Sequence, residues 1–550
     1  MKGIKLFTAA LLGLAMIACS NPKKMAEQAE NVNVACQPET LEVVAGKVDV
    51  KVDVTYPADY FLPDVYLKVT PVVVYEGGEF ALSELTYQGE KVQDNYKVVP
   101  TAGGTVTENL SFDFQPGMEK CYLELRGVVS KGKQSVDLPS KKAADGCNVT
   151  YMLVNKCGKV DYKADNYQEV LFENPEAQIL YTIGSAEVRG SQLSAKNVKD
   201  FQAALKEAKA NERKTITGVD VVAYASPDGG EELNSKLSDK RSNSANKVFG
   251  KVVKDKEVAA GDVRSIGQDW EGFQELVSES NIEDKDLILR VLSMYSDPAV
   301  REQEIKNMSA VYKTLAQKVL PELRRARFIA TVENKNFTAE ELATLVEENI
   351  DVLDEEALLR AAANKEKDAD KVAIYRKAVE KFASARAQYN LAVALFKSGD
   401  KAAAKAELDK CAKDADVNNF YGVLALTDND ITAAANFFAA SGNATSKKNS
   451  AVVDILNGNY SAAASKLSGE KGFNAALAAV LTGNYSAAKN ALDCENGCCP
   501  KCAAKCAYLS AVIAAREGNA DEVKAQLEKV SADAELAARA AKDIEFAKFN

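Results

Sequence analysis

From about Asn336 onward the chain repeats one short pattern, an apolar segment of helical character that ends in Gly followed by Asn or Asp. An Ala-rich stretch of helix-forming residues follows each of these turns, which are Gly399-Asp400, Gly458-Asn459, Gly483-Asn484 and Gly518-Asn519. The glycines are 59, 25 and 35 residues apart, and the longest interval contains a weaker copy at Leu424–Asp430. Helical pairs repeated at such intervals stack, because one pair cannot bury its apolar face alone. We therefore predict an α-helical solenoid over residues 336–550.

These repeats resemble tetratricopeptide repeats. An aromatic or small residue follows the turn and an Ala comes two to four positions later, as in that family, whereas the unequal spacing departs from it. The resemblance implies a groove that holds a protein partner, whose identity the sequence does not indicate. The alternative is an Ala-rich helical bundle without a groove.

The N-terminal region has a different period. Val48, Val50, Val52 and Val54 alternate with charged residues, as expected for a strand with one buried face. Further strand-like runs follow at Val65–Tyr75, Tyr96–Val99, Leu110–Phe114 and Tyr122–Val129, separated by Gly and Pro turns. We expect an immunoglobulin-like β-sandwich over residues 39–150. Cys121 and Cys147 can form a disulfide in it, although sequence alone does not pair them.

The first residues are a targeting segment. A basic start precedes the apolar run Leu6–Ala18, which is too short to span a bilayer. Met16-Ile17-Ala18-Cys19 resembles a bacterial lipobox, which implies that residues 1–18 are removed and that Cys19 is lipidated. Residues 19–38 then form a tether to the outer membrane. The alternative is an ordinary secretory signal whose cleavage site happens to precede a cysteine.

Composition argues against most enzyme classes. The chain has no histidine, which removes Ser–His–Asp and Cys–His catalysis, His-ligated zinc and imidazole bases. With 69 basic and 79 acidic residues the net charge is −10, which argues against nucleic acid as a partner. We predict a non-enzymatic protein without a cofactor.

The middle region alternates strands and helices. Ile179–Ile183, Ile216–Tyr224, Val263–Ile266 and Arg327–Val332 read as strands, Ser194 is a candidate helix cap, and Asp269–Leu320 is a long helical stretch. Between Ala223 and Arg241 the chain has a strand end, Ser226-Pro227-Asp228-Gly229, and then Asn234-x-x-Leu237-Ser238-x-x-Arg241. This run resembles the peptidoglycan-binding domain of OmpA-like proteins without a gap. The resemblance covers about residues 177–335, within a domain that we place at 165–335, with residues 270–320 as an insertion.

The resemblance implies a site for the diaminopimelate residue of a peptidoglycan stem peptide. Arg241 would hold a carboxylate through its fork of donors. The family histidine falls on Tyr224, and the family aspartate that binds the ammonium falls on Ser226, so Asp228, two positions on, is the candidate replacement. Asn234 lies on a family position and completes the candidate site. The alternative for Asp228 is a turn residue without a ligand.

Cys494, Cys498, Cys499, Cys502 and Cys506 form a cluster. We expect disulfides or buried packing positions in the helical region of an exported protein. The alternative is a metal site, with Cys498, Cys499, Cys502 and Cys506 as the candidate ligands.

Together these features predict a multidomain α+β lipoprotein of the Bacteroidetes type, anchored in the outer membrane with its domains in the periplasm. Its expected function is to tether the envelope to peptidoglycan while the repeats scaffold a protein partner. The alternative is an assembly scaffold of an envelope or secretion machine whose OmpA-like domain no longer binds peptidoglycan. Ser226 favours the alternative and Arg241 favours the tether.

Overall fold

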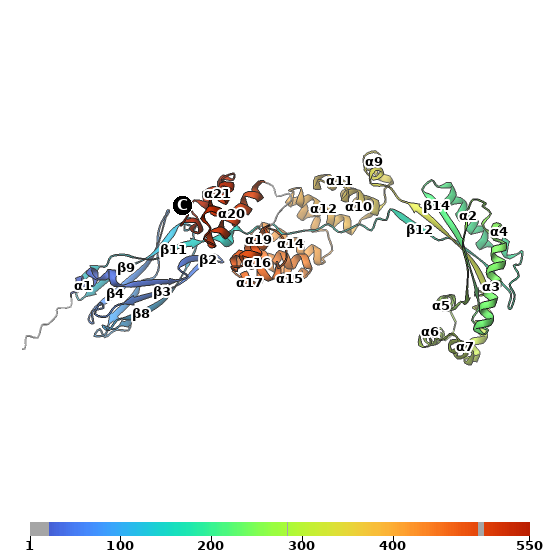
Figure 1. Cartoon of the computed structure of the whole chain (residues 1–550), viewed down its shortest axis with the longest axis horizontal. Helices are drawn as coiled ribbons and strands as arrows, with labels where there is room; N and C mark the ends of the chain where they lie inside the picture. Colours follow the sequence, from blue (N-terminus) through green and yellow to red (C-terminus); the bar gives the residue numbers. More distant parts are fainter. Residues whose placement is uncertain (1–20, 283, 493–499, 550) are drawn as a thin grey trace, which may run out of the picture. The chain divides into compact units, whose positions relative to one another are not determined.

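The computed structural model describes residues 21–282, 284–492 and 500–549, and the fold is mixed α+β. The predicted signal peptide, Cys19 and the cysteines 494, 498 and 499 lie outside the described residues. The chain forms two compact units, Met1–Tyr162 with Gly399–Asn550 and Lys163–Ser398. The first unit therefore combines the N-terminal strands, blue to cyan in Figure 1, with the C-terminal helices, drawn in orange to red.

The N-terminal strands form one curled sheet, whose central path has the order β1-β3-β2-β11-β9-β4-β6-β7. Strand β2 pairs with β3 through Val43 and Val44 and with β11 through Thr40 and Glu42. It therefore joins the half of the sheet that contains β1 and β3 to the half that contains β11, β9 and β4. The expected alternation is confirmed in β3, where Val48, Val50 and Val52 are all buried, while Val54 is half-buried. The strands are β1 Asn33–Gln37, β2 Thr40–Val44, β3 Lys47–Tyr56, β4 Tyr66–Tyr75, β5 Gly78–Ala81, β6 Leu85–Gly89, β7 Lys97–Val99, β8 Gly104–Asp113, β9 Cys121–Lys131, β10 Gln134–Asp137 and β11 Lys141–Asn148.

The stretch assigned to the tether has regular structure in the part that is described. Helix α1, Pro22–Glu27, is capped by Asn21, and its Met25 is buried. The short 3-10 helix η1, Ala29–Asn31, leads into β1, which pairs with β3 from Asn33 to Gln37. From residue 22 onward this stretch is therefore part of the N-terminal fold.

A second sheet occupies the middle of the chain, with the order β12-β16-β14-β15 and β13 paired to β16. The expected strands are confirmed at β14 Lys214–Ala225, β15 Ala260–Gln268 and β16 Arg325–Lys335. Strand β13, Glu176–Leu180, begins and ends earlier than the expected Ile179–Ile183, and β12, Val170–Glu173, was not expected. Helices α2 Lys196–Ala210, α3 Glu231–Lys247 and α4 Phe249–Val253 bury Val219, Val221 and Ala223 of β14 in a shared core. The prediction that Ser194 caps α2 is wrong. Ser194 ends the 3-10 helix η3, Gln192–Ser194, and Ala195 is the N-cap.

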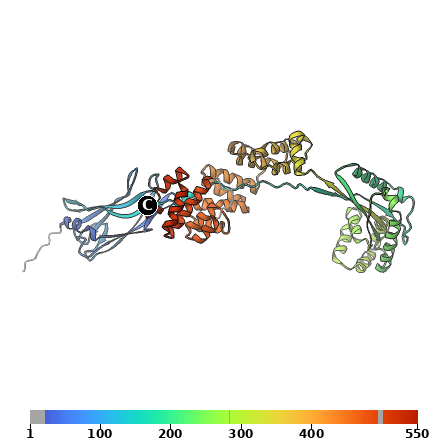
Figure 2. The ribbon, with the colours of Figure 1, turned by 45° about the horizontal axis from the view of Figure 1, so that its top comes forward.

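The expected long helical stretch is divided into α5 Trp270–Glu279, α6 Lys285–Met294, α7 Pro298–Asn307 and α8 Ser309–Lys318, between β15 and β16 (Figures 1 and 2). These helices bury a core of their own around Phe273, Ile288 and Leu315. Asp269, at the start of α5, pairs with Arg325, at the start of β16, with 2.9 Å between Nε and Oδ2. This buried pair joins the two ends of the segment to the sheet.

After β16 the chain is helical. The helices are α9 Ala339–Glu348, η4 Ile350–Val352, α10 Glu355–Ala363, α11 Asp368–Phe382, α12 Ala385–Lys397, α13 Lys401–Leu408, α14 Ala415–Thr427, α15 Ile431–Ser441, α16 Ala444–Leu456, α17 Tyr460–Lys466, α18 Phe473–Leu481, α19 Tyr485–Ala491, α20 Pro500–Arg516, α21 Ala520–Val530, α22 Ala534–Ala540 and η5 Ile544–Phe546. Gly458, Gly483 and Gly518 adopt φ of +77°, +76° and +76°, a conformation that glycine enters without a steric cost. The next residue is the N-cap of the following helix. Asn484 accepts from the amide of Ala487 and Asn519 from that of Glu522, whereas the side chain of Asn459 makes no cap hydrogen bond. The predicted helix–Gly–Asn–helix unit is confirmed at these turns.

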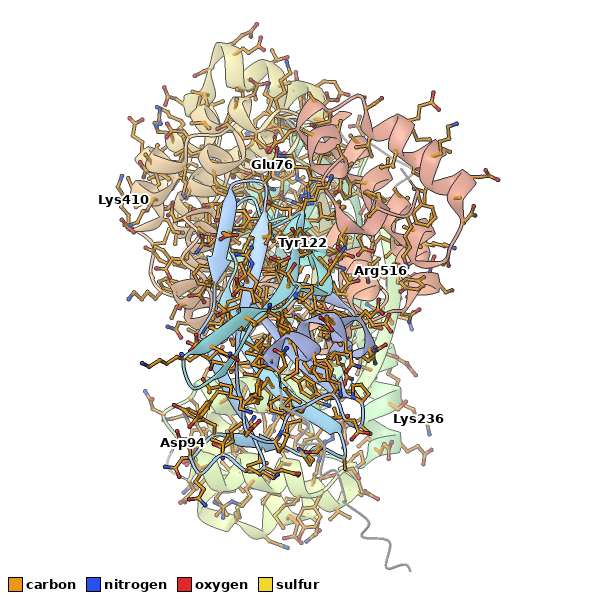
Figure 3. All side chains as sticks on the ribbon, turned by 90° about the vertical axis from the view of Figure 1, so that its left-hand side faces the viewer. Glu76, Asp94, Tyr122, Lys236, Lys410 and Arg516 are labelled. Atoms are coloured by element: carbon orange, nitrogen blue, oxygen red, sulfur yellow. The ribbon has the colours of Figure 1, made fainter. Side chains whose placement is uncertain are left out.

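The C-terminus is fastened to the N-terminal sheet within the first unit. Glu545 of η5 accepts hydrogen bonds from Asn148 at the end of β11, from Thr150 and from Arg516. Figure 3 labels Arg516 and also Glu76, which pairs with Lys542 at 2.7 Å between Nζ and Oε2. Segments nearly 400 residues apart in sequence thus meet in one polar junction.

The pair between Asp269 and Arg325 provides a test of this fold. Replacing Asp269 with Ala leaves a buried guanidinium without its counter-charge, and we expect a loss of about 3–5 kcal/mol in the free energy of unfolding. The chain has one tryptophan, Trp270, next to this pair, so intrinsic fluorescence during denaturant unfolding reports on it directly. Glu271→Ala, which removes an exposed carboxylate two residues away, is the control and should change stability little. Equal stability of both variants would contradict the role of the pair.

Candidate functional site

The candidate peptidoglycan-binding residues lie together at the C-terminal end of β14. Ser226 and Asp228 occupy the loop between β14 and α3, and Asn234 and Arg241 lie on α3. Asn234 holds the loop closed, because its Nδ2 donates to the carbonyls of Ser226 at 3.0 Å and Gly229 at 2.7 Å. The sequence therefore predicted the grouping, and the structure gives Asn234 a role in shaping the loop.

Arg241 is completely buried, with 0% of its surface exposed. Its Nε donates to the carbonyl of Ser185 and its Nη1 to that of Tyr224, both at 3.0 Å, and Nη2 lies 3.4 Å from the carbonyl of Thr182. The guanidinium also stacks on the ring of Tyr181 at 5.1 Å. Burial lowers the pKa of Arg241 to about 10, which still leaves it charged at neutral pH. Arg241 thus ties the loop after β13 to the end of β14 and does not reach the surface.

Asp228 is engaged by another arginine that sequence reasoning did not assign. Arg324, just before β16, donates from Nη2 to Asp228 Oδ2 at 2.9 Å and from Nε to the hydroxyl of Ser226 at 3.2 Å. The Ser226 hydroxyl in turn donates to Asp228. The Arg324 and Asp228 side chains are only 11% and 15% exposed. The charge of Asp228 is therefore neutralised within the domain.

The segment expected to be an insertion lies close to this loop. A hydrogen bond to Glu302 raises the pKa of Lys306 on α7, and the negative charge of Asp228 adds to that rise. Helix α7 therefore lies near enough to Asp228 for their charges to interact.

Some of the cysteines predicted to form a disulfide or a metal site lie among the described residues, and others do not. Cys121 of β9 and Cys147 of β11 are buried, with their Sγ atoms 3.6 Å apart. Of the metal candidates, Cys498 and Cys499 lie outside the described residues, the side chain of Cys502 is not described, and Cys506 is half-buried on α20. Among the side chains that are described, no group of three carboxylates or thiols has the arrangement of a metal site.

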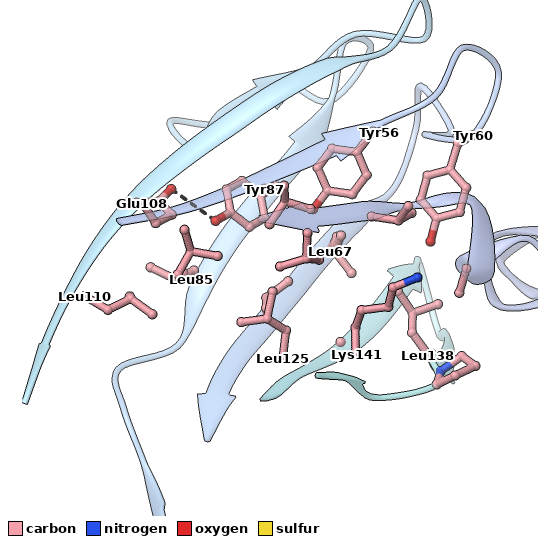
Figure 4. A pocket seen from close by; sticks show the side chains of 18 residues that line it. Tyr56, Tyr60, Leu67, Leu85, Tyr87, Glu108, Leu110, Leu125, Leu138 and Lys141 are labelled. Atoms are coloured by element: carbon pink, nitrogen blue, oxygen red, sulfur yellow. Dashed lines mark hydrogen bonds between the residues drawn. The ribbon is translucent and has the colours of Figure 1, made fainter. Parts of the chain in front are cut away.

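The curled N-terminal sheet encloses an apolar cavity of about 60 Å³. Its lining comes from both halves of the sheet and includes Leu67, Leu110 and Leu125, with Tyr87 hydrogen-bonded to Glu108 in the wall (Figure 4). Within the described residues, no helix has the length and apolar character needed to cross a bilayer.

Sequence reasoning missed a second constellation, in the helical part of the first unit. Residues 154–168, here called the strap, have no regular secondary structure and connect the N-terminal sheet to β12. The side chain of Asn449 on α16 accepts from the Lys159 amide at 2.8 Å and donates to the Lys159 carbonyl at 2.9 Å. Asn474 on α18 binds Asn155 in the same way, with both distances 2.8 Å. Each asparagine thus satisfies both backbone groups of one strap residue.

Asn419 on α14 completes this set, which we call the asparagine clasp: Asn419, Asn449 and Asn474. Its Nδ2 donates to the Lys159 carbonyl at 3.0 Å, and its Oδ1 accepts from Asn449 at 2.8 Å. The second unit repeats the motif independently, because Asn390 on α12 accepts from the Lys163 amide at 2.7 Å and donates to the Lys163 carbonyl at 2.9 Å. The strap residues bound in this way are four apart.

A signal for the clasp was present in the repeat. Asn390, Asn449 and Asn474 each lie nine residues before the glycine that ends the helix, at Gly399, Gly458 and Gly483. Nine residues are two and a half helical turns, so these side chains occupy the same position in each helix. The pattern identifies equivalent asparagines, but it does not indicate that their ligand belongs to the same chain.

No family model matches the chain, and no curated protein shows significant sequence similarity to it. The resemblances described above therefore stay predictions.

Arg241 gives the first testable consequence of this geometry. Arg241→Met removes the donors to the Ser185 and Tyr224 carbonyls while it keeps a long side chain, and we expect a loss of roughly 3 kcal/mol in stability. Trp270 fluorescence during denaturant unfolding measures it, and Lys240→Met, at an exposed neighbouring position, is the matched control. Unchanged stability in Arg241→Met would indicate that the guanidinium is held for a ligand.

The two buried thiols of Cys121 and Cys147 give a second testable consequence. In protein exported to an oxidising compartment, we expect Cys121 and Cys147 to be joined, which stabilises the fold by about 3 kcal/mol relative to the reduced form. Peptide mapping without reductant should recover the linked peptides, while the exposed Cys157 reacts with maleimide in the folded protein. Free Cys121 and Cys147 thiols after unfolding without reductant would contradict this expectation.

Proposed function

We propose that this protein is a lipid-anchored, non-enzymatic assembly scaffold of the bacterial envelope whose OmpA-like domain does not bind peptidoglycan. In this proposal the curled N-terminal sheet is the immunoglobulin-like module, the central sheet with α2 and α3 is the OmpA-like domain, and the helices after β16 are tetratricopeptide-like repeats. The anchor at Cys19 and the periplasmic location are carried over from the sequence.

The burial of Arg241 carries this proposal. A stem-peptide carboxylate would have to reach a guanidinium that has no exposed surface and that already donates to backbone carbonyls. An ammonium would have to compete with Arg324 for Asp228, because the two side chains form an ion pair. Both charges that recognition of diaminopimelate requires are thus occupied inside the domain.

A peptidoglycan tether is the second candidate. The observation that favours it is the proximity of Ser226, Asp228 and Arg324, which brings both signs of charge to one loop. A zwitterionic ligand would need both, but it would also need the loop to open and the Arg324–Asp228 pair to separate.

A sacculus pull-down of the full chain in detergent distinguishes the two candidates. We expect no specific retention of the wild-type protein, and none for Ser226→Asp, because Arg241 stays buried in both. The control is Lys236→Ala, an exposed position on α3 labelled in Figure 3. Retention that is competed by a diaminopimelate peptide and lost in Asp228→Ala would overturn the scaffold proposal in favour of the tether.

The anchor has a separate test. We expect Cys19→Ala to move the protein from the membrane fraction to the soluble fraction, because acyl chains attached to this residue supply the membrane affinity in our proposal. Fractionation after a high-salt wash, with Cys36→Ala as the matched cysteine control, measures the change. Continued sedimentation of Cys19→Ala with membranes would show that another contact holds the protein there.

A further inference from the structure

The strap is recognised mainly through its backbone. The clasp bonds the amides and carbonyls of Asn155 and Lys159, whereas the side chains of Lys156, Cys157 and Lys159 are exposed. A segment without regular structure cannot pair these groups internally, so the asparagines replace the partners that a neighbouring strand would supply. Some side chains add contacts of their own, because Lys156 Nζ donates to Asn429 and Lys505 Nζ donates to Asn155 Oδ1.

Two strap positions are selective. A Cβ atom built on Gly158 would lie 2.4 Å from Val423 Cγ2 on α14, so the strap approaches this helix more closely than any residue with a side chain allows. Val160, two residues on, is buried. The site therefore binds an extended backbone, requires glycine opposite Val423, and accepts an apolar residue two positions later.

We propose that the asparagine clasp is a peptide-binding site for extended segments with this Gly-x-apolar pattern, and that residues 154–162 occupy it as an exchangeable ligand from the same chain. The partner is then a protein segment with the same pattern, which binds when the strap leaves. This inference goes beyond the scaffold proposal and does not depend on whether the OmpA-like domain binds the cell wall.

Covalent connection explains why the strap fills the site. A ligand tethered by a short link acts at an effective concentration in the millimolar range, so a free peptide of equal intrinsic affinity competes poorly. The strap is also held from its N-terminal side, where Asn148 and Thr150 bind Glu545. A variant that weakens only the strap should therefore open the clasp to a peptide supplied in solution.

The experiment uses the full chain as receptor and a fluorescent peptide of residues 152–165 with Cys157 replaced by Ser. We expect the peptide to bind the Gly158→Val chain at least tenfold more tightly than the wild-type chain, because valine at 158 collides with Val423 and displaces the strap. The same peptide carrying Gly158→Val should bind neither chain. Fluorescence anisotropy measures all four combinations.

Two further receptors test the clasp itself. Adding Asn449→Ala to the Gly158→Val chain should weaken peptide binding by at least tenfold, because it removes a donor and an acceptor for Lys159. Adding Asn436→Ala, an exposed asparagine on α15, should leave binding unchanged. Equal binding to the wild-type and Gly158→Val chains, no binding to either, or binding that ignores Asn449→Ala would overturn the proposal.

If Gly158→Val prevents folding, Gly158→Ala serves as the milder receptor with the same expected order of affinities. Amide hydrogen exchange, measured on single variants of the wild-type chain that keep Gly158, supplies an independent test. The Lys159 amide should exchange at least tenfold faster in Asn449→Ala than in Asn436→Ala, because only the first loses its acceptor. Equal rates in these two variants would show that the clasp does not hold the strap.

Discussion

The backbone of residues 154–168 has no strand or helix partner within its own segment, and its amides and carbonyls still need hydrogen bonds. The helices meet this constraint with asparagine, the short side chain that carries a donor and an acceptor on one planar group. Asn449 and Asn474 each bind both polar groups of one strap residue, and Asn390 does the same in the second unit. The path of the chain between its two sheets therefore depends on helices that come hundreds of residues later.

This constraint explains why the compact units do not follow the order of the chain. The N-terminal sheet joins the C-terminal helices through β11, Thr150 and Glu545, and the strap then runs along α14, α16 and α18. The strap already occupies the clasp, and this changes how the helical region can bind a partner. Helices α14, α16 and α18 bind a segment of the protein itself through the clasp asparagines, so in our proposal a partner segment has to displace it.

In the central domain, the predicted site residues are grouped in space, but their polar atoms bind other groups of the same domain. Ser226, Asp228, Asn234 and Arg241 lie together, as the sequence predicted, but each is engaged inside the domain. Arg324 was not assigned from the sequence, because an arginine in a run at a strand start has no pattern that points to a loop almost a hundred residues earlier. Its pairing with Asp228 is the feature that most weakens a wall-binding role, together with the burial of Arg241.

The sequence by itself determined the features that depend on local periodicity and turn chemistry. The alternating valines of β3, the strands β14, β15 and β16, and the helices that end at Gly458, Gly483 and Gly518 follow from residues close together in the chain. Only the tertiary structure decided how Arg241 is used, which arginine neutralises Asp228, and that the clasp asparagines hold residues 154–162. The reason is that each of these depends on which groups are brought within about 3 Å across large sequence separations. A repeat of asparagines marks equivalent positions on successive helices, but packing alone decides that Lys159 meets Asn449, 290 residues away.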